Sequence, residues 1–170
     1  DSEDFLEKDG NSNNVLFLPA FNGLGAPYWN SEIRGGFYGI TQDTSIEDMN
    51  TATFQSIAFQ TKDITNIISL YDIKIQKLLV DGGMVSNKTF CQVLADTLQI
   101  EIVKPKNVES TAIGACKIAM LSSGMSIENL SKNEISYKVN KDSRDVYFRN
   151  YSKWQEYLLY MIKLNQIFIV

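Results

Sequence analysis

The feature that most constrains the fold is a strand-like run that passes through two glycines directly into a helix-like segment. Residues 75–80, Ile-Gln-Lys-Leu-Leu-Val, have the length and composition of a buried strand, and Asp81, Gly82 and Gly83 follow at once. Residues 86–98 then place apolar side chains on one helical face. This strand–turn–helix order is typical of α/β folds, in which ligands bind at the carboxyl ends of strands.

The neighbouring segments extend this unit. Apolar spacing predicts a long helix over about 46–70, and Thr44 with Glu47 predicts a capping box at its start. A strand at 101–104 and a helix at 109–123 follow. The order helix–strand–helix–strand–helix predicts a parallel sheet with right-handed crossovers. Small residues recur along the last helix and predict its close approach to a sheet: Ala112, Gly114, Ala115 and Ala119.

The two ends of the chain are less regular. Short strands are predicted at 15–18 and 36–40, with a structured loop over 20–32 between them. Residues 125–146 are polar and are predicted to be irregular. A final helix is predicted over about 147–164, because aromatic and apolar side chains recur there at helical spacing.

Composition excludes several functions. The chain has no histidine, which rules out a His-dependent catalytic pair or a His-ligated metal within it. Its 16 Lys and Arg against 20 Asp and Glu leave a net charge of −4, with no footprint for nucleic acid. No apolar run could span a membrane and no signal peptide is seen, so a cytoplasmic location is predicted. Cys91 and Cys116 are predicted to be buried apolar side chains.

The Gly-Gly turn is the first candidate site. Gly82 and Gly83 would let a ligand approach the backbone, the helix behind them offers unpaired amides, and Asn87 is close enough to bind a nucleotide. The alternative is a strand–helix turn that needs glycine for packing alone, and spacing does not decide between them. Asp81 is interpreted as a residue that caps the turn rather than as a metal ligand or base.

The loop at residues 19–29 is the second candidate. Its glycines, prolines and aromatics predict a fixed conformation that either shapes a pocket or covers a sheet edge. Arg34, just after it, could reach a phosphate, although solvent exposure is the default for an arginine.

These segments resemble the FGGY family of carbohydrate kinases. The run Pro-Ala-Phe-Asn-Gly-Leu-Gly-Ala-Pro-Tyr-Trp at 19–29 is similar to a segment of the members that phosphorylate glycerol, departing only at Asn22, where they carry Thr. Residues 80–87, Val-Asp-Gly-Gly-Met-Val-Ser-Asn, resemble the family's adenosine-binding turn. Four further segments fit the family in the same order: 35–55, 56–63, 109–115 and 151–154.

The resemblance implies a fold and a role. The fold would be a partial ribonuclease-H-like (actin-like ATPase) domain, α/β, with a mixed sheet and helices on both faces. Residues 1–170 would be the C-terminal part of the ATP-binding lobe, with the N-terminal lobe and the catalytic Asp absent from this chain. Gly82, Gly83 and Asn87 would bind ATP, which carries Mg²⁺, and this chain would hold no catalytic or metal-ligating residue.

The full-length protein would then transfer the γ-phosphoryl group of ATP to glycerol, giving glycerol 3-phosphate, as a homo-oligomer in the cytoplasm without nucleic-acid or membrane partners. Two alternatives stay open. One is another FGGY sugar or polyol kinase, and the other is a non-catalytic actin-like nucleotide-binding module. If the chain is instead an α/β domain without a ligand-binding role, the full-length protein would bind no nucleotide.

Overall fold

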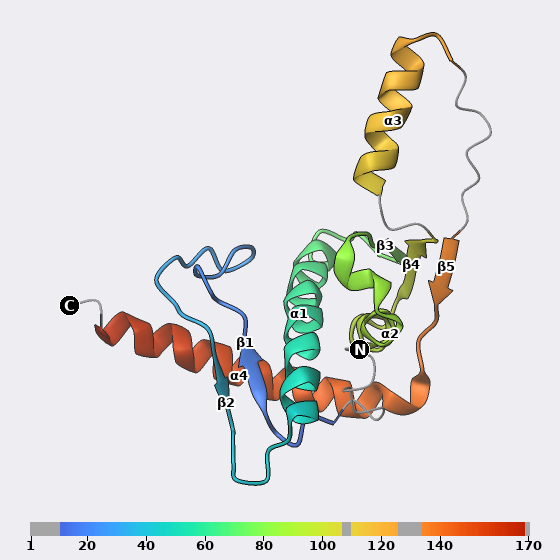
Figure 1. Cartoon of the computed structure of the whole chain (residues 1–170). Helices are drawn as coiled ribbons and strands as arrows, with labels where there is room; N and C mark the ends of the chain where they lie inside the picture. Colours follow the sequence, from blue (N-terminus) through green and yellow to red (C-terminus); the bar gives the residue numbers. More distant parts are fainter. Residues whose placement is uncertain (1–10, 107–109, 126–133, 169–170) are drawn as a thin grey trace.

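Two sheets lie on opposite sides of a long central helix. The computed structural model of the chain describes residues 11–106, 110–125 and 134–168 (Figure 1). Helix α1 (Ile46–Ser69) stands between the strand pair β1–β2 and the α2–β3–β4 unit, and helix α4 (Arg144–Phe168) runs across the same side of all of them. The chain therefore crosses the molecule at its end and ties the first strands to the later ones.

The larger sheet has three strands in the order β3–β4–β5. Strand β3 (Lys77–Leu79) pairs in parallel with β4 (Glu101–Pro105), and helix α2 (Lys88–Leu98) makes the connection between them. This confirms the predicted strand–turn–helix–strand unit. Strand β5 (Glu134–Tyr137) adds to β4 in antiparallel orientation. The sheet is therefore mixed, as the family resemblance implied, and not wholly parallel, as the order of helices and strands predicted.

Strand β5 corrects the prediction that residues 125–146 are irregular. Those residues are polar overall, but Ile135 and Tyr137 alternate with polar neighbours, and pairing satisfies backbone groups along the edge of β4. Tyr137 packs against the core cluster under the sheet. So short a run becomes a strand only because it pairs with β4, which is distant in the sequence.

The small sheet precedes α1 in the chain. Strand β1 (Leu16–Leu18) pairs antiparallel with β2 (Gly36–Tyr38), which confirms the two predicted short strands. The side chains of β1 are buried on both faces: Leu16 and Leu18 lie in a cluster with residues of α1 and α4, and Phe17 lies in a cluster with Ala52 of α1 and Phe37 of β2. The loop between β1 and β2 contains the Gly- and Pro-rich residues 19–29.

Helix α1 begins at Ile46, as predicted, but its N-cap lies one residue later than the predicted Thr44. Ser45, not Thr44, is the N-cap: its hydroxyl accepts from the Asp48 amide at 3.0 Å, and the Asp48 carboxylate accepts from the Ser45 amide at 2.8 Å. Thr44 instead accepts from the Thr41 amide and closes the preceding turn. Burial opposes ionisation of Asp48, but its hydrogen bonds to Ser45 and Asn13 outweigh that effect and hold its pKa below the usual value.

Among the described residues, the two larger of three clusters of buried side chains hold the layers together. The first lies between β1, α1 and α4 and is centred on Phe59 and Trp154, whose indole N–H donates to the Phe17 carbonyl at 2.7 Å. The second lies between α1, α2 and the larger sheet. Its buried members are Ala58, Val85, Phe90, Cys91, Val93, Leu94, Ala95, Leu98, Ile102 and Tyr147. Helix α1 contributes to both clusters.

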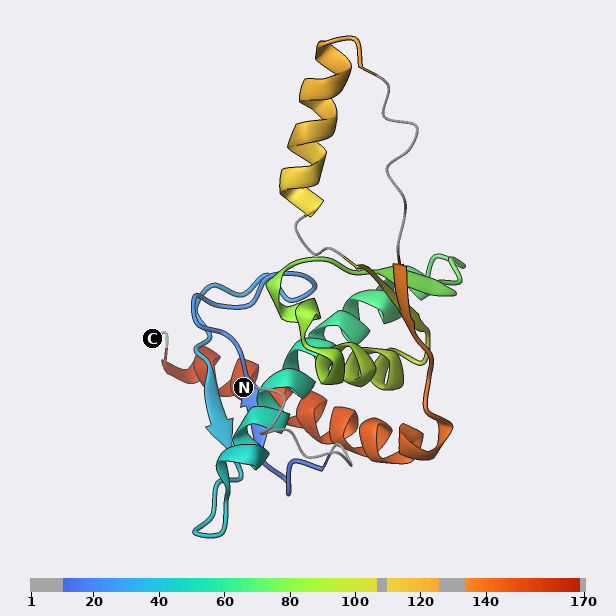
Figure 2. The same cartoon turned by 45° about the vertical axis from the view of Figure 1, so that its right-hand side comes forward.

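Helix α3 (Ser110–Ser122) departs from expectation. It projects away from the other elements (Figures 1 and 2), and none of its residues is buried. The predicted close approach to a sheet is therefore wrong for the described residues, and Cys116, predicted to be buried, is exposed. Ile118 and Leu121 are exposed as well, although apolar residues on all sides of a helix are typical of a buried one.

The core on α4 gives a stability prediction with a matched control. Leu158 is 1% exposed and its neighbour Leu159 is 53% exposed. We expect Leu158→Ala to lower the free energy of unfolding by about 2–5 kcal/mol, because it leaves a cavity in the first cluster. Leu159→Ala should change it by less than about 1 kcal/mol. Urea denaturation of both variants checks this, and equal effects would contradict the packing of α4.

Candidate functional site

The Gly-Gly turn lies at the carboxyl end of β3, where the sequence placed it. The Val80 amide donates to the Val103 carbonyl at 2.9 Å, which is the last contact of the parallel pair. After Asp81 and Gly82 the chain forms a short 3₁₀ helix, η2 (Gly83–Ser86), and α2 begins at Lys88. The turn therefore sits on the edge of an α/β sheet at which ligands bind in such folds.

The structure explains why glycine is needed at position 82 but not at position 83. Gly82 has φ 107° and ψ 175°, a conformation that only glycine adopts without strain. Gly83 has no positive φ, and a Cβ built on either glycine would meet no heavy atom within 4 Å. Backbone conformation therefore explains Gly82, whereas neither conformation nor packing among the described residues explains Gly83.

Asn87 has a structural role that the sequence prediction missed. It is buried, and its side-chain oxygen accepts from the Phe90 amide at 2.9 Å, which makes it the N-cap of α2. This hydrogen bond orients the side chain at the start of the helix. The prediction that Asn87 also binds a nucleotide stays a prediction.

Asp81 does not cap the turn. Its side chain is exposed, and its carboxylate has no hydrogen-bond partner among the residues that the structure describes. The interpretation of Asp81 as a capping residue is therefore wrong for this part of the chain. Within the described ranges, no group of three or more Cys, Asp or Glu side chains is placed to hold a metal ion.

The underside of the turn is fixed by a buried lysine. Lys104, on β4, is 5% exposed, and its ammonium donates to the carbonyls of Val85 and Ser86. The Cys91 thiol donates to the same Val85 carbonyl at 3.3 Å, and burial raises the pKa of that thiol. Period-two alternation could have placed Lys104 on the same face as the buried Ile102, but it could not show what the ammonium contacts.

The loop at 19–29 is anchored to the helices by a tyrosine. The Tyr28 hydroxyl donates to the Asp63 carboxylate of α1 at 2.7 Å, and the Tyr151 hydroxyl of α4 donates to the other oxygen of that carboxylate. Burial, together with the Asp63 charge, raises the pKa of both tyrosines well above the ordinary value. At the other end of the loop, Phe21 and Trp29 are exposed. The loop is structured, as predicted, and its two possible roles stay open.

Arg34 is exposed to solvent, as expected by default for an arginine. Its guanidinium donates to the carbonyls of Ser31 and Ile33, in its own loop, at 2.7 and 2.9 Å. These contacts assign it no part in a site.

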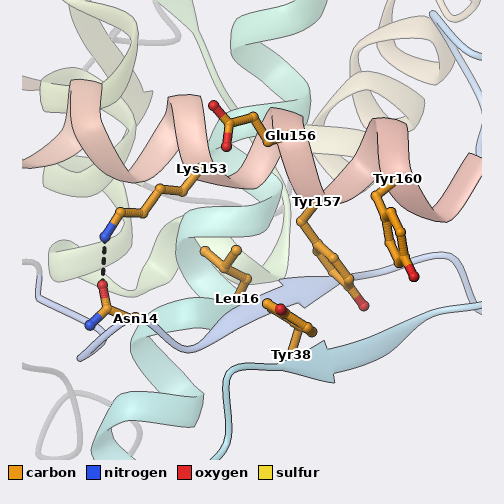
Figure 3. Close-up of a pocket in the computed structure, with 7 residues that line it drawn as sticks. All are labelled: Asn14, Leu16, Tyr38, Lys153, Glu156, Tyr157 and Tyr160. Carbon is orange, nitrogen blue, oxygen red and sulfur yellow. Dashed lines mark hydrogen bonds between the residues drawn. The ribbon is translucent and has the colours of Figure 1, made fainter.

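A shallow groove of about 350 Å³ lies away from the turn, between the small sheet and α4 (Figure 3). Tyr38 and Tyr157 stack there with centroids 5.1 Å apart, and the Lys153 ammonium donates to the Asn14 side chain at 2.6 Å. Leu16, Glu156 and Tyr160 complete its lining. Its lysine is paired within the groove rather than directed at a free ligand, so the Gly-Gly turn remains the stronger candidate.

Comparison with known proteins decides the family. The profile of the FGGY family of carbohydrate kinases, C-terminal domain, matches residues 3–123. The chain belongs to this family. It is 46% identical over 125 residues to the glycerol kinase of Streptococcus pneumoniae strain Hungary19A-6, covering 73% of this chain and 25% of that protein. This FGGY chain thus spans about a quarter of the length of the curated relatives it matches.

Solved structures agree on the fold. The crystal structure of Plasmodium falciparum glycerol kinase with ADP is 30% identical and has a TM-score of 0.77, covering 94% of this chain and 33% of that one. Ligand-bound xylulose kinase from Lactobacillus acidophilus is 21% identical, with a TM-score of 0.79 over 98% of this chain and 35% of that one. The second likeness shows the ribonuclease-H-like fold alone. None of the described helices is long and apolar enough to cross a membrane.

The geometry of the turn yields a prediction that separates its two glycines. Gly82→Ala should destabilise the protein by about 1–3 kcal/mol, because alanine is strained at a φ of 107°. Gly83→Ala should be nearly neutral in stability, since its methyl group enters open space. Thermal unfolding of both variants is the measurement. A loss of stability at Gly83 equal to that at Gly82 would show that both glycines serve the fold.

Proposed function

We propose that the FGGY chain is part of a kinase that transfers the γ-phosphoryl group of ATP to glycerol, giving glycerol 3-phosphate. The sequence relation supports glycerol, because the relatives that are 46% identical are glycerol kinases. The loop at 19–29 supports the same acceptor, since it departs from the glycerol-phosphorylating members only at Asn22. Because this chain spans a quarter of those relatives, the activity belongs to the full-length protein.

The contribution of this chain would be the adenosine side of the ATP site, formed by Gly82, Gly83 and Asn87. The main support for this assignment is Gly83, where neither backbone conformation nor packing requires a glycine. A Cβ at this position would meet no atom within 4 Å, and the residue is exposed near the carboxyl end of a strand. A ligand that approaches the backbone there would account for it. The related Plasmodium glycerol kinase was crystallised with ADP.

The same assignment leaves the chemistry to other parts of the enzyme. Phosphoryl transfer needs Mg²⁺ to neutralise charge on the phosphates and a carboxylate to accept the proton of the attacking hydroxyl. The described residues offer no cluster of acidic side chains for the metal. We propose that Mg²⁺ enters with the nucleotide, and that the catalytic Asp lies in the part of the protein that precedes this chain.

Helix α3 supports the view that this chain is the C-terminal part of a larger lobe. It is apolar on all sides, yet none of its residues is buried in the described structure. Helices of that composition are stable when covered. We propose that the preceding part of the ATP-binding lobe covers α3 in the full-length protein.

Another FGGY sugar kinase is the second candidate. Xylulose and gluconate kinases share the fold at 16–23% identity, which carries no information on the acceptor. An acceptor panel of glycerol, xylulose and gluconate with the full-length protein distinguishes the two. We expect turnover with glycerol, whereas turnover with a sugar alone would replace glycerol as the substrate. Binding of ATP without phosphorylation of any acceptor would favour a non-catalytic nucleotide-binding module.

The decisive test of the nucleotide site is calorimetric titration of Mg·ATP, with glycerol present, into the full-length protein and its Gly83→Asp variant. The new carboxylate would stand where the nucleotide lies, so we expect the variant to lose at least about tenfold in affinity, through steric and like-charge repulsion. Circular dichroism and thermal unfolding should show an intact fold, since the side chain enters open space.

Gly25→Asp is the matched control. Gly25 is also exposed, has no positive φ and offers open space to a Cβ, but it lies in the 19–29 loop. We expect it to bind Mg·ATP as wild type does. Equal affinity of wild type and Gly83→Asp would show that the Gly-Gly turn is structural and that ATP binds elsewhere.

A further inference from the structure

Lys104 is buried beneath the Gly-Gly turn without an acidic partner. Its side chain is 5% exposed, and no carboxylate among the described residues forms an ion pair with it. An ammonium removed from water is costly unless hydrogen bonds replace its hydration. Here main-chain carbonyls take the place of the hydrating water molecules. The charged ammonium therefore holds the backbone of those carbonyls in position.

Those carbonyls belong to the 3₁₀ helix of the turn. The ammonium donates to the Val85 carbonyl and, at 3.3 Å, to the Ser86 carbonyl. It also lies 5.7 Å from the centre of the Tyr137 ring on β5, a favourable site for a cation. Lys104 therefore joins β4, β5 and η2 at one point.

The other carbonyls of the turn accept hydrogen bonds from residues three positions further along the turn. The carbonyl of Gly82 accepts from the Val85 amide at 3.2 Å, and that of Met84 accepts from the Asn87 amide at 3.1 Å. The Gly83 carbonyl accepts from the Ser86 hydroxyl. Each carbonyl from Gly82 to Ser86 thus has a donor. Those of Val85 and Ser86 accept from the Lys104 ammonium, and that of Val85 also accepts from the Cys91 thiol.

We propose that Lys104 is a positioning residue for the nucleotide: it fixes the 83–86 turn from below, so that the exposed backbone of Gly83 and the start of α2 present one geometry to ATP. This inference rests on the proposed function, because it matters for activity only if the nucleotide binds at this turn. Lys104 itself touches neither substrate, since its ammonium is directed into the protein. Its removal displaces the binding surface without removing a contact.

Lys104→Met tests the proposal in the full-length enzyme, because methionine keeps an unbranched apolar stem and removes the charge and its donors. We expect the KM for Mg·ATP to rise by roughly tenfold, since a small displacement of a binding surface weakens the binding of its ligand strongly. The KM for glycerol should change by less than about twofold, because the turn is proposed to bind only the nucleotide. An unchanged KM for ATP, or equal rises for both substrates, would overturn the proposal.

Lys104→Arg is the conservative rescue. Its guanidinium can donate to the same carbonyls, so we expect it to restore most of the affinity for ATP. An arginine variant as weak for ATP as the methionine variant would contradict the role of the hydrogen bonds. Lys77→Met is the matched control, because Lys77 is an exposed lysine of the neighbouring strand β3, and its kinetics should equal those of wild type.

Folding is monitored by thermal unfolding, and Lys104→Gln serves as the second variant if the methionine enzyme does not fold. Its amide keeps a donor without charge and should give a KM for ATP between wild type and the expected methionine value. A glutamine enzyme with wild-type KM for ATP would overturn the proposal.

Comparison with Gly83→Asp separates this inference from the proposed function. If Gly83→Asp loses ATP binding and the Lys104 variants do not, only the positioning role fails. If Gly83→Asp binds ATP normally, the turn is not the nucleotide site and both fail. We expect both residues to affect ATP, with Gly83→Asp the more severe.

Discussion

The buried carboxylate of Asp63 is the interaction on which the arrangement of the segments depends. It lies on α1, is 5% exposed, and accepts from Tyr28 of the 19–29 loop and from Tyr151 and Gln155 of α4. An isolated charge at this depth would be unfavourable, and three donors from distant parts of the chain compensate it. Tyr151 also accepts from Asn66, one turn further along α1. The loop and both long helices are therefore held in one relative position.

From this fixed centre the structure extends to the site. The opposite face of α1 packs on α2 through Ala58 and the side chains around Phe90, and α2 in turn covers β3 and β4. The position of the Gly-Gly turn follows, because it connects β3 to α2 and is held from below by Lys104. The turn is hydrogen-bonded to Lys104 on its inner side and open on its outer side, where Gly82 and Gly83 are exposed.

The sequence predicted the elements whose signal is local. The helical spacing around Phe59 and Phe90, the short apolar strands and the glycines at 82–83 all located their elements to within a few residues. Interactions between segments distant in sequence could not be predicted in this way. Three features depend on such distant partners: the pairing of β5, the contacts of Lys104 and the Asp63 network. The N-cap role of Ser45 was missed for another reason, because Thr44 beside it is an equally good capping residue. Helix α3 was predicted correctly as a helix, but its predicted burial was wrong, because its apolar composition is typical of a covered helix and the described residues do not cover it.

A crystal structure of the full-length protein with Mg·ADP and glycerol would show whether the nucleotide binds at the proposed Gly82–Asn87 turn. We expect the adenosine to lie in van der Waals contact with the backbone of Gly82 and Gly83, with the inner side of the turn unchanged and the Lys104 ammonium still bonded to Val85. A nucleotide bound in another cleft, with the turn still facing solvent, would show that the turn is not the nucleotide site and would leave the two glycines with a purely structural role.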